Sequence, residues 1–147
     1  MTEARLTRIL LLFWALYFTV VTLSNLTELL KALHVLPSTW FWVSGNLGFI
    51  GSGTAKLGAP LWLNRVLLAG VIAWETAAAV LFWRALGRPS DEAALVPPFV
   101  VSLALWAIFI VLDEVLLIFE TGAEATHVRL FTAELLTLIA IRLLPSR

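Results

Sequence analysis

The residues with the greatest capacity for chemistry are carboxylates that interrupt long apolar stretches. Glu75 lies within GVIAWETAAAV, Asp113 and Glu114 lie within FIVLDEVLLIF, and Glu134 lies within FTAELLTLIA. A carboxylate at the centre of a bilayer costs about 2.5–3.5 kcal/mol on insertion scales, so such groups usually face the interior of a bundle and have a partner. These positions are therefore the first candidates for a site.

The two histidines and the acids near them raise the question of a metal site. Glu124 and His127 have the Glu-x-x-His spacing that points both side chains to one face of a helix, as in di-iron bundles. A di-iron site needs a second copy of this motif, and the sequence has none. A single divalent ion bound among His127, Glu124, His34 and Glu28 is the remaining metal hypothesis. Both histidines stand at the ends of apolar stretches, which disfavours axial ligation of a buried haem.

Several other chemistries find no support in the sequence. The absence of cysteine excludes disulfides, thiolate metal sites and cysteine nucleophiles. Ten basic and ten acidic residues give a net charge of zero, so no basic field indicates a nucleic-acid partner. No serine nucleophile elbow, zinc-protease histidine pair or phosphate-binding loop is present.

The composition of the 147-residue chain places these polar groups in a membrane protein. Hydrophobic residues make up 61% of the chain and charged residues 14%, whereas soluble domains are roughly half apolar and a quarter charged. The mean hydropathy is +0.95. The excess apolar surface has to face lipid. The expected fold is therefore all-α, a single transmembrane domain over residues 1–147 built as a bundle of about four helices.

Four segments are expected to form the spans: Leu6–Leu33, Leu61–Trp83, Leu95–Phe119 and the shorter His127–Leu144. The first has the outline of a secretion signal, but no small-residue cleavage site follows it, which favours a retained span. Between the first two spans, glycines, prolines and the Trp40–Trp42 cluster predict an external interfacial or re-entrant segment. A helix from Trp40 to Ile50 would be too short to cross. GRPSDEAALVPP and ETGAEAT are expected as hydrophilic turns.

Basic residues flanking the spans favour a multi-pass protein of the inner (plasma) membrane with both termini cytoplasmic. In this orientation six arginines are cytoplasmic: Arg5, Arg8, Arg84, Arg88, Arg142 and Arg147. Four basic residues are external: Lys31, Lys56, Arg65 and Arg129. In this orientation most polar residues fall in the outer half. The predicted buried polar cluster consists of Asn25, Glu28, Arg65, Asp113, Glu114, Arg129 and Glu134.

Three interpretations of this outer cluster stay open. In the first, Arg65, Arg129 and Lys31 neutralise the acids and hold the helices together. In the second, the cluster binds a partner subunit, a quinone or a lipid headgroup, and in the third it binds the metal ion. Glu75 is expected as an isolated intramembrane acid, either hydrogen-bonded across helices in its neutral form or one station in a proton path.

A series of short motifs follows the chain in order: Ser24-Asn25-Leu26-Thr27-Glu28, His34-Val35-Leu36, Asn64-Arg65, Trp74-Glu75 and Arg129-Leu130-Phe131. This order resembles the bacterial family of predicted small integral membrane proteins, over nearly the whole chain. The resemblance implies four spans and a long external loop. The chain departs from the family pattern at Ser24 and Glu28, where asparagine and aspartate are usual, and the interval from Asn25 to His34 is about one helical turn shorter. The family has no established activity, so the resemblance implies architecture alone.

A weaker resemblance connects the segment Phe49–Leu57 to another group. Phe49-Ile50-Gly51-Ser52-Gly53, leading to Lys56-Leu57 and then to Glu75 in the next helix, is similar to DoxX-like four-helix membrane proteins. That resemblance implies an association with redox proteins, but this chain has no cysteine thiol to take part in redox chemistry.

These observations favour a non-catalytic accessory or scaffolding subunit of a larger membrane complex. Its expected partners are the lipid bilayer and other membrane-protein subunits or a second copy of itself, with no nucleic acid. The alternative is a stand-alone protein that binds a metal, a quinone or a small ligand in an outer-leaflet cluster of carboxylates and histidines. The cofactor stays unknown, and an enzymatic role is not indicated.

Overall fold

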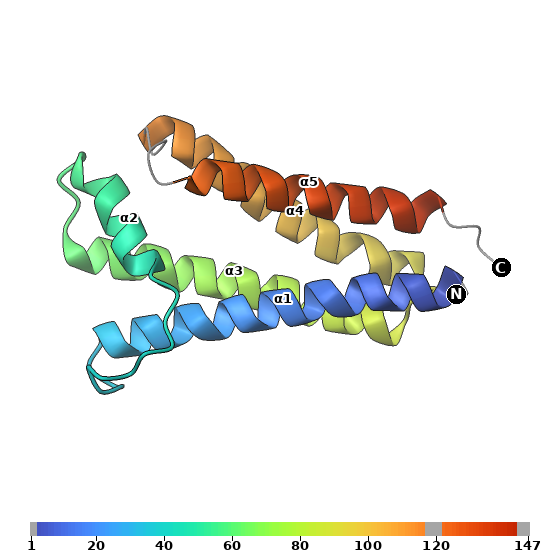
Figure 1. The fold of residues 1–147 in the computed structure, drawn as a ribbon, viewed down its shortest axis with the longest axis horizontal. Coiled ribbons are helices and arrows are strands. Elements are labelled where there is room, and N and C mark those ends of the chain that lie inside the picture. The colour runs from blue at the N-terminus through green and yellow to red at the C-terminus, as the bar shows by residue number, and fades with distance from the viewer. Residues whose placement is uncertain (1–2, 117–121, 144–147) are drawn as a thin grey trace.

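The structure is a computed structural model that describes residues 3–116 and 122–143, and in these ranges the regular elements are all helices (Figure 1). The five helices are α1 (Glu3–Ala32), α2 (Asn46–Ala55), α3 (Leu61–Gly87), α4 (Glu92–Leu116) and α5 (Ala123–Leu143). Three of them, α1, α3 and α4, are long and apolar enough to cross a membrane. The all-α class is confirmed, whereas the fourth span, for which α5 is the candidate, stays a prediction.

One difference from the expected boundaries is at the start of α4, which begins at Glu92 and not at Leu95. The predicted turn GRPSDEAALVPP ends at Asp91, because the carboxylate of Asp91 accepts a hydrogen bond of 3.0 Å from the backbone N–H of Ala93. Its carbonyl also accepts from the N–H groups of Ala94 and Leu95, at 3.0 Å each. An aspartate in this position satisfies the free donors of a helix N-terminus, so α4 begins three residues before Leu95. Pro97 and Pro98 consequently lie inside the helix.

The segment between α1 and α3 contains a short helix, later in the chain than the expected Trp40–Ile50. Residues 40–44 are irregular, and α2 begins after Gly45, whose φ of 83° suits a residue without a side chain. Two side chains of α1 hold the irregular stretch in place. The hydroxyl of Thr27 donates to the carbonyl of Trp42 at 2.7 Å, and the ammonium of Lys31 donates to the carbonyl of Trp40 at 2.7 Å.

The four long helices form two pairs that diverge toward one end. Figure 1 shows α1 beside α3 and α4 beside α5, and α3 also packs against α4. The pairs converge where α1 begins, α3 turns into α4 and α5 ends; we call this the terminal end. They diverge at the opposite end, where α2 lies, which we call the α2 end.

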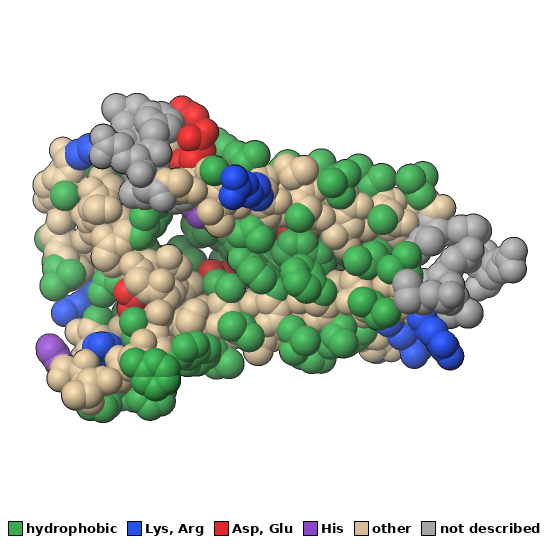
Figure 2. Space-filling model, in the orientation of Figure 1, with side chains coloured by type: hydrophobic (Ala, Val, Ile, Leu, Met, Phe, Trp, Pro, Cys, Tyr) green, Lys and Arg blue, Asp and Glu red, His purple; other side chains and the backbone are tan. Residues whose placement is uncertain are grey.

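The hydrophobic core fills the half of the bundle nearer the terminal end. It centres on aromatic side chains of α1, α3 and α4, among them the buried Trp14, Phe18, Phe82, Phe99 and Trp106. The rings of Phe18 and Phe82 stack at a centroid separation of 5.6 Å, and Phe99 meets Phe82 edge to face at 5.1 Å. Exposed apolar side chains spread over the outside of the helices (Figure 2), as expected for lipid-facing surfaces.

Candidate functional site

Buried polar side chains are concentrated from the middle of the bundle to the α2 end. Apart from Thr7, the buried polar residues of the described chain are Asn25, Thr54, Asn64, Glu75, Ser102, Asp113 and Glu134. Each belongs to a small group of hydrogen-bonded partners on different elements. The interior is therefore mainly apolar and aromatic in one half and polar in the other.

Glu75, expected as an isolated intramembrane acid, has a hydrogen-bond partner on a facing helix. It is 2% exposed, and the side-chain amide of Asn25 on α1 donates to both of its carboxylate oxygens, at 2.8 and 3.0 Å. The carbonyl oxygen of Asn25 in turn accepts from the amide of Asn46 in α2, at 2.8 Å. This contact agrees with the expectation of a hydrogen bond across helices: one asparagine on a facing helix supplies both donors, and a chain of three residues joins α3, α1 and α2.

Glu28 lies at the beginning of α2. One of its oxygens accepts a hydrogen bond of 3.1 Å from the backbone N–H of Leu47, and the other accepts from the hydroxyl of Ser44. A carboxylate at a helix N-terminus satisfies a free donor and interacts favourably with the helix dipole. Glu28 therefore caps α2 and holds it against α1, which accounts for this acid without a metal.

The contact between α2 and α3 is also polar. The hydroxyl of Thr54 donates to the side-chain carbonyl of Asn64 at 2.7 Å. The amide nitrogen of Asn64 lies near Gly51, where a Cβ would be 3.5 Å away, an ordinary van der Waals distance. The short helix is thus attached to both α1 and α3 by hydrogen bonds from its own residues or its cap.

Glu134 connects α5 to α4 near the middle of both helices. It is fully buried, and its two oxygens accept from the hydroxyl of Ser102 and from the indole N–H of Trp106, the latter at 2.8 Å. Tyr17 of α1 packs edge to face on Trp106, with the ring centroids 6.3 Å apart, so α1 also contacts this group.

Asp113 and His127 form a pair closer to the α2 end. The imidazole Nδ1 lies 2.6 Å from a carboxylate oxygen of Asp113, which is buried, while the histidine side chain is 16% exposed. The imidazole stacks on Trp106 at 6.1 Å and packs against Phe109 at 5.0 Å. Its Nε2 makes no hydrogen bond within the described part of the chain. Asp113 thus fixes the orientation of a ring that keeps one polar atom available.

Other members of the predicted cluster do not join these groups. Glu114 and Arg129 are exposed, so their assignment to a buried cluster was wrong. Arg65 is half-buried, and its Nε is a buried atom with no hydrogen-bond partner. Within residues 3–116 and 122–143, the partners of the internal acids are amide, hydroxyl, indole and imidazole groups. The sequence suggested that basic side chains neutralise the internal acids, namely Arg65, Arg129 and Lys31. In the structure, the hydrogen-bond partners of these acids are other groups.

The four metal candidates are separated by the fold. His34 is exposed beyond the end of α1 with a φ of 60°, Glu28 caps α2, and Glu124 is half-buried one turn before His127. Among the described residues, no three histidine, aspartate or glutamate side chains come together in a way that could hold a metal ion. Within this part of the chain the four candidates therefore do not form one site: Glu28 caps α2, His127 pairs with Asp113, and His34 is exposed.

The residues that the sequence did not single out are the neutral donors. Ser44, Ser102 and Trp106 donate to the acids, and Asn46 donates to Asn25. Serine and tryptophan are ordinary in membrane helices and give no signal by type. Spacing offered a partial signal, because Ser102, Trp106 and Asp113 stand four and seven residues apart and so follow one face of α4.

The space between the helix pairs opens at the α2 end. Figure 2 shows the surface hollowed there, with acidic side chains and a histidine at the edge of the hollow. The polar groups described above come from α1 and α3 on one side and from α4 and α5 on the other. Aromatic rings of the core close the space toward the terminal end. Such a space can receive a molecule with an apolar ring and a few hydrogen-bonding groups.

Comparisons with known proteins add no relative. No family model, curated protein or solved structure matches the chain. Assignment of a function therefore depends on the chemistry of the site.

Proposed function

We propose that the chain is a four-span protein of the inner membrane with both termini cytoplasmic. Three spans follow from α1, α3 and α4. Support for the fourth comes from α5, whose 21 residues are about 31 Å long at the usual helical rise and run beside α4. Its acid Glu134 is satisfied by α4, which lowers the cost of placing it in lipid.

The orientation is supported by the arginines of the terminal end. Arg5, Arg8, Arg84, Arg88 and Arg142 flank the helices there, and the predicted Arg147 lies outside the described residues. Lys31, Lys56, Arg65 and Arg129 belong to the α2 end. Because basic residues are retained preferentially in the cytoplasm, the terminal end is assigned to the inside and the α2 end to the outside.

The function that the geometry supports best is binding of a lipid-soluble ring of the quinone type in the space between the helix pairs. The observation that carries this proposal is the Asp113–His127 pair, whose imidazole packs against both Trp106 and Phe109 and whose Nε2 has no hydrogen-bond partner among the described residues. Protonated imidazole donates from Nε2 to a ring carbonyl, and the tautomer with its hydrogen on Nδ1 accepts from a ring hydroxyl at Nε2. One residue can therefore bind the oxidised and the reduced form of such a ring.

The surroundings suit the rest of such a ligand. The aromatic side chains offer stacking surfaces for a planar ring, and offset or edge-to-face contacts of this kind contribute about 0.5–1.5 kcal/mol each. The hollow at the α2 end (Figure 2) leaves a way for an apolar tail to reach the outer leaflet. The proposal concerns binding alone, and no electron transfer is assigned to the chain.

Binding is tested by titrating the detergent-purified protein with a short-chain ubiquinone and following its tryptophan fluorescence. We expect saturable quenching in the unaltered protein, because Trp106 lies against His127. His127→Leu should raise the dissociation constant at least tenfold, since it removes the hydrogen-bonding atom. Asp113→Asn should weaken binding less, because it keeps a partner for the ring.

The matched control is Glu124→Gln, one turn before His127 on the same helix. Its expected dissociation constant is that of the unaltered protein, since within the described residues Glu124 has no hydrogen bond or ion pair with His127 or Asp113. Equal quenching in the His127→Leu and Glu124→Gln proteins would contradict the proposal, as would quenching that increases linearly without saturation.

The accessory-subunit role remains a second candidate because of the exposed aromatic segment at the α2 end. Phe41 is 88% exposed, and Trp62 and Leu61 at the start of α3 are also exposed. An accessory role predicts that Phe41→Ser reduces co-purification of a partner from a mild detergent extract several-fold, without changing the thermal stability of the isolated protein. An unchanged set of co-purifying proteins would remove the support for this role.

A further inference from the structure

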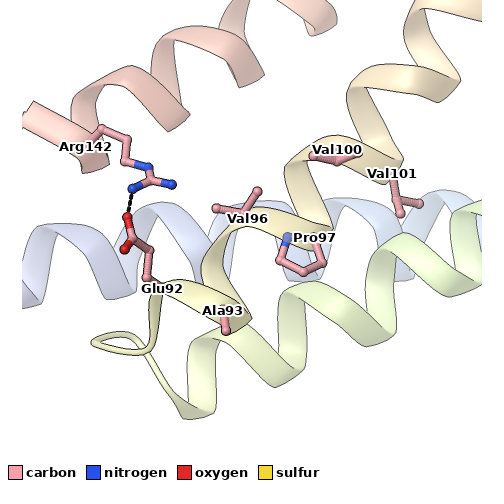
Figure 3. Close-up of a pocket in the computed structure, with 7 residues that line it drawn as sticks. All are labelled: Glu92, Ala93, Val96, Pro97, Val100, Val101 and Arg142. Atoms are coloured by element: carbon pink, nitrogen blue, oxygen red, sulfur yellow. Dashed lines mark hydrogen bonds and ion pairs between the residues drawn. The ribbon is translucent and has the colours of Figure 1, made fainter.

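A second feature, unrelated to the α2 end, lies at the terminal end of α4. Figure 3 shows a groove along the first turns of α4, lined by Glu92, Ala93, Val96, Pro97, Val100 and Val101 and reached by Arg142 of α5. Its volume is about 640 Å³, and most of its lining surface is apolar. The α4 residues repeat at spacings of three to four, so they follow one face of the helix for about 14 Å.

The charged groups stand together at one end of this groove. Arg142 donates to the carboxylate of Glu92, and the two side chains are 47% and 72% exposed. An exposed ion pair contributes only about 0–1 kcal/mol, so its members exchange partners at little cost. The groove thus begins at one cation and one anion and continues as an apolar surface toward the middle of α4.

The proline pair adds a backbone acceptor at the same place. Pro97 has no N–H, so the carbonyl of Ala93, which would bond to residue 97 in a regular helix, has no donor at that position. Ala93 follows Glu92 directly in the groove lining. The charged end therefore has an anion and a backbone carbonyl on α4 and a cation on α5.

We propose that this groove binds a phospholipid with a phosphoethanolamine headgroup, its phosphate on Arg142, its ammonium on Glu92 and one acyl chain along the apolar face of α4. Arginine binds phosphate oxygens through two parallel N–H groups, and the ammonium of the lipid supplies donors to the Glu92 carboxylate. The bound headgroup would break the Arg142–Glu92 ion pair and form two others, phosphate with Arg142 and ammonium with Glu92. Neither side chain is then left without a partner of opposite charge. Val96, Val100 and Val101 then cover the chain near the headgroup.

The two charges select among phospholipids. A phosphocholine headgroup keeps the phosphate but has no N–H to donate, so it loses the bonds to Glu92 and Ala93. A phosphoglycerol headgroup has a neutral glycerol in place of the ammonium, so Glu92 loses its ion pair. The expected preference is therefore for phosphoethanolamine over both other headgroups with the same acyl chains, by about tenfold, which corresponds to one charge-assisted hydrogen bond.

Native mass spectrometry of the detergent-purified full chain tests the site. The protein is titrated separately with palmitoyl-oleoyl phosphatidylethanolamine, phosphatidylcholine and phosphatidylglycerol, and the apparent dissociation constant for the first bound lipid is measured. Glu92→Gln should reduce binding of the ethanolamine lipid to the level of the choline lipid. Arg142→Gln should weaken all three lipids about tenfold, because each has a phosphate.

Arg88→Gln is the matched control, since Arg88 is an exposed arginine of the same end that does not line the groove. Its lipid binding should equal that of the unaltered protein. Soluble glycerophosphoethanolamine should not compete, because it has no chain to occupy the apolar face. The site is contradicted by equal affinity for the three lipids, by unchanged selectivity in Glu92→Gln, or by a loss in Arg88→Gln as large as that in Arg142→Gln.

Discussion

Replacement of Phe82 by alanine is expected to destabilise the bundle by about 3–5 kcal/mol, the largest effect of any single substitution considered for this chain. Phe82 is fully buried and packs on three other rings: Phe18 at 5.6 Å, Trp14 at 6.5 Å and Phe99 at 5.1 Å. Helices in lipid associate through packing of this kind, because there is little gain from removing apolar surface from lipid. The cavity left by the alanine removes the packing of α3 against both α1 and α4 at this position.

The measurement is unfolding of the purified protein by SDS, followed by circular dichroism. Val80→Ala, two residues earlier on α3, is the control, since Val80 is 59% exposed and faces away from the core. Its expected effect is within about 0.5 kcal/mol. If the two alanine variants unfolded at the same SDS fraction, the aromatic cluster would not be the element that holds the helices together.

Asn25→Leu is expected to destabilise the protein by about 1–3 kcal/mol, because it leaves the buried carboxyl group of Glu75 without its two hydrogen bonds. The double variant Asn25→Leu/Glu75→Leu should recover part of this loss, since it removes both partners of the buried pair, while the amide of Asn46 still lacks its acceptor on Asn25. The recovery distinguishes a satisfied polar pair from simple loss of volume at position 25. The same SDS titration measures both variants.

Ser24→Ala serves as the control for the Asn25 series. The hydroxyl of Ser24 bonds to the carbonyl of Val21 in its own helix, so its removal should cost little. Additive losses in the double variant, with no recovery, would mean that the Asn25–Glu75 contact does not connect α1 and α3. That result would also weaken the explanation of why an acid is tolerated in the middle of α3.

The long apolar helices could be predicted from the sequence because hydropathy over some 20 residues depends only on local composition. The concentration of acids toward one end was also predictable, since it follows from counting along each span. The beginning of α4 was not predictable from hydropathy. It depends on a hydrogen bond from the backbone N–H of Ala93 to the side chain of Asp91. The prolines that follow gave a misleading indication of a turn.

The pairing of the internal acids lay beyond the sequence for a different reason. Asn25 and Glu75 are 50 positions apart, and Ser102 and Glu134 are 32 apart. Which residues meet depends on the rotation and axial register of two helices, which one sequence does not specify. Arg65 illustrates the same limit: opposite charge suggested a pairing with the acids, but the donors that reach them are neutral.

The central claim is that a quinone-type ring binds between the helix pairs, beside His127. Photolabelling with an azido-ubiquinone in native membranes, followed by identification of the modified peptides, tests this location directly. The account predicts labelled residues near Trp106, Phe109 and His127, in amounts that fall when unlabelled short-chain ubiquinone is added. Label spread over the lipid-facing sides of the helices, undiminished by the competitor, would contradict it.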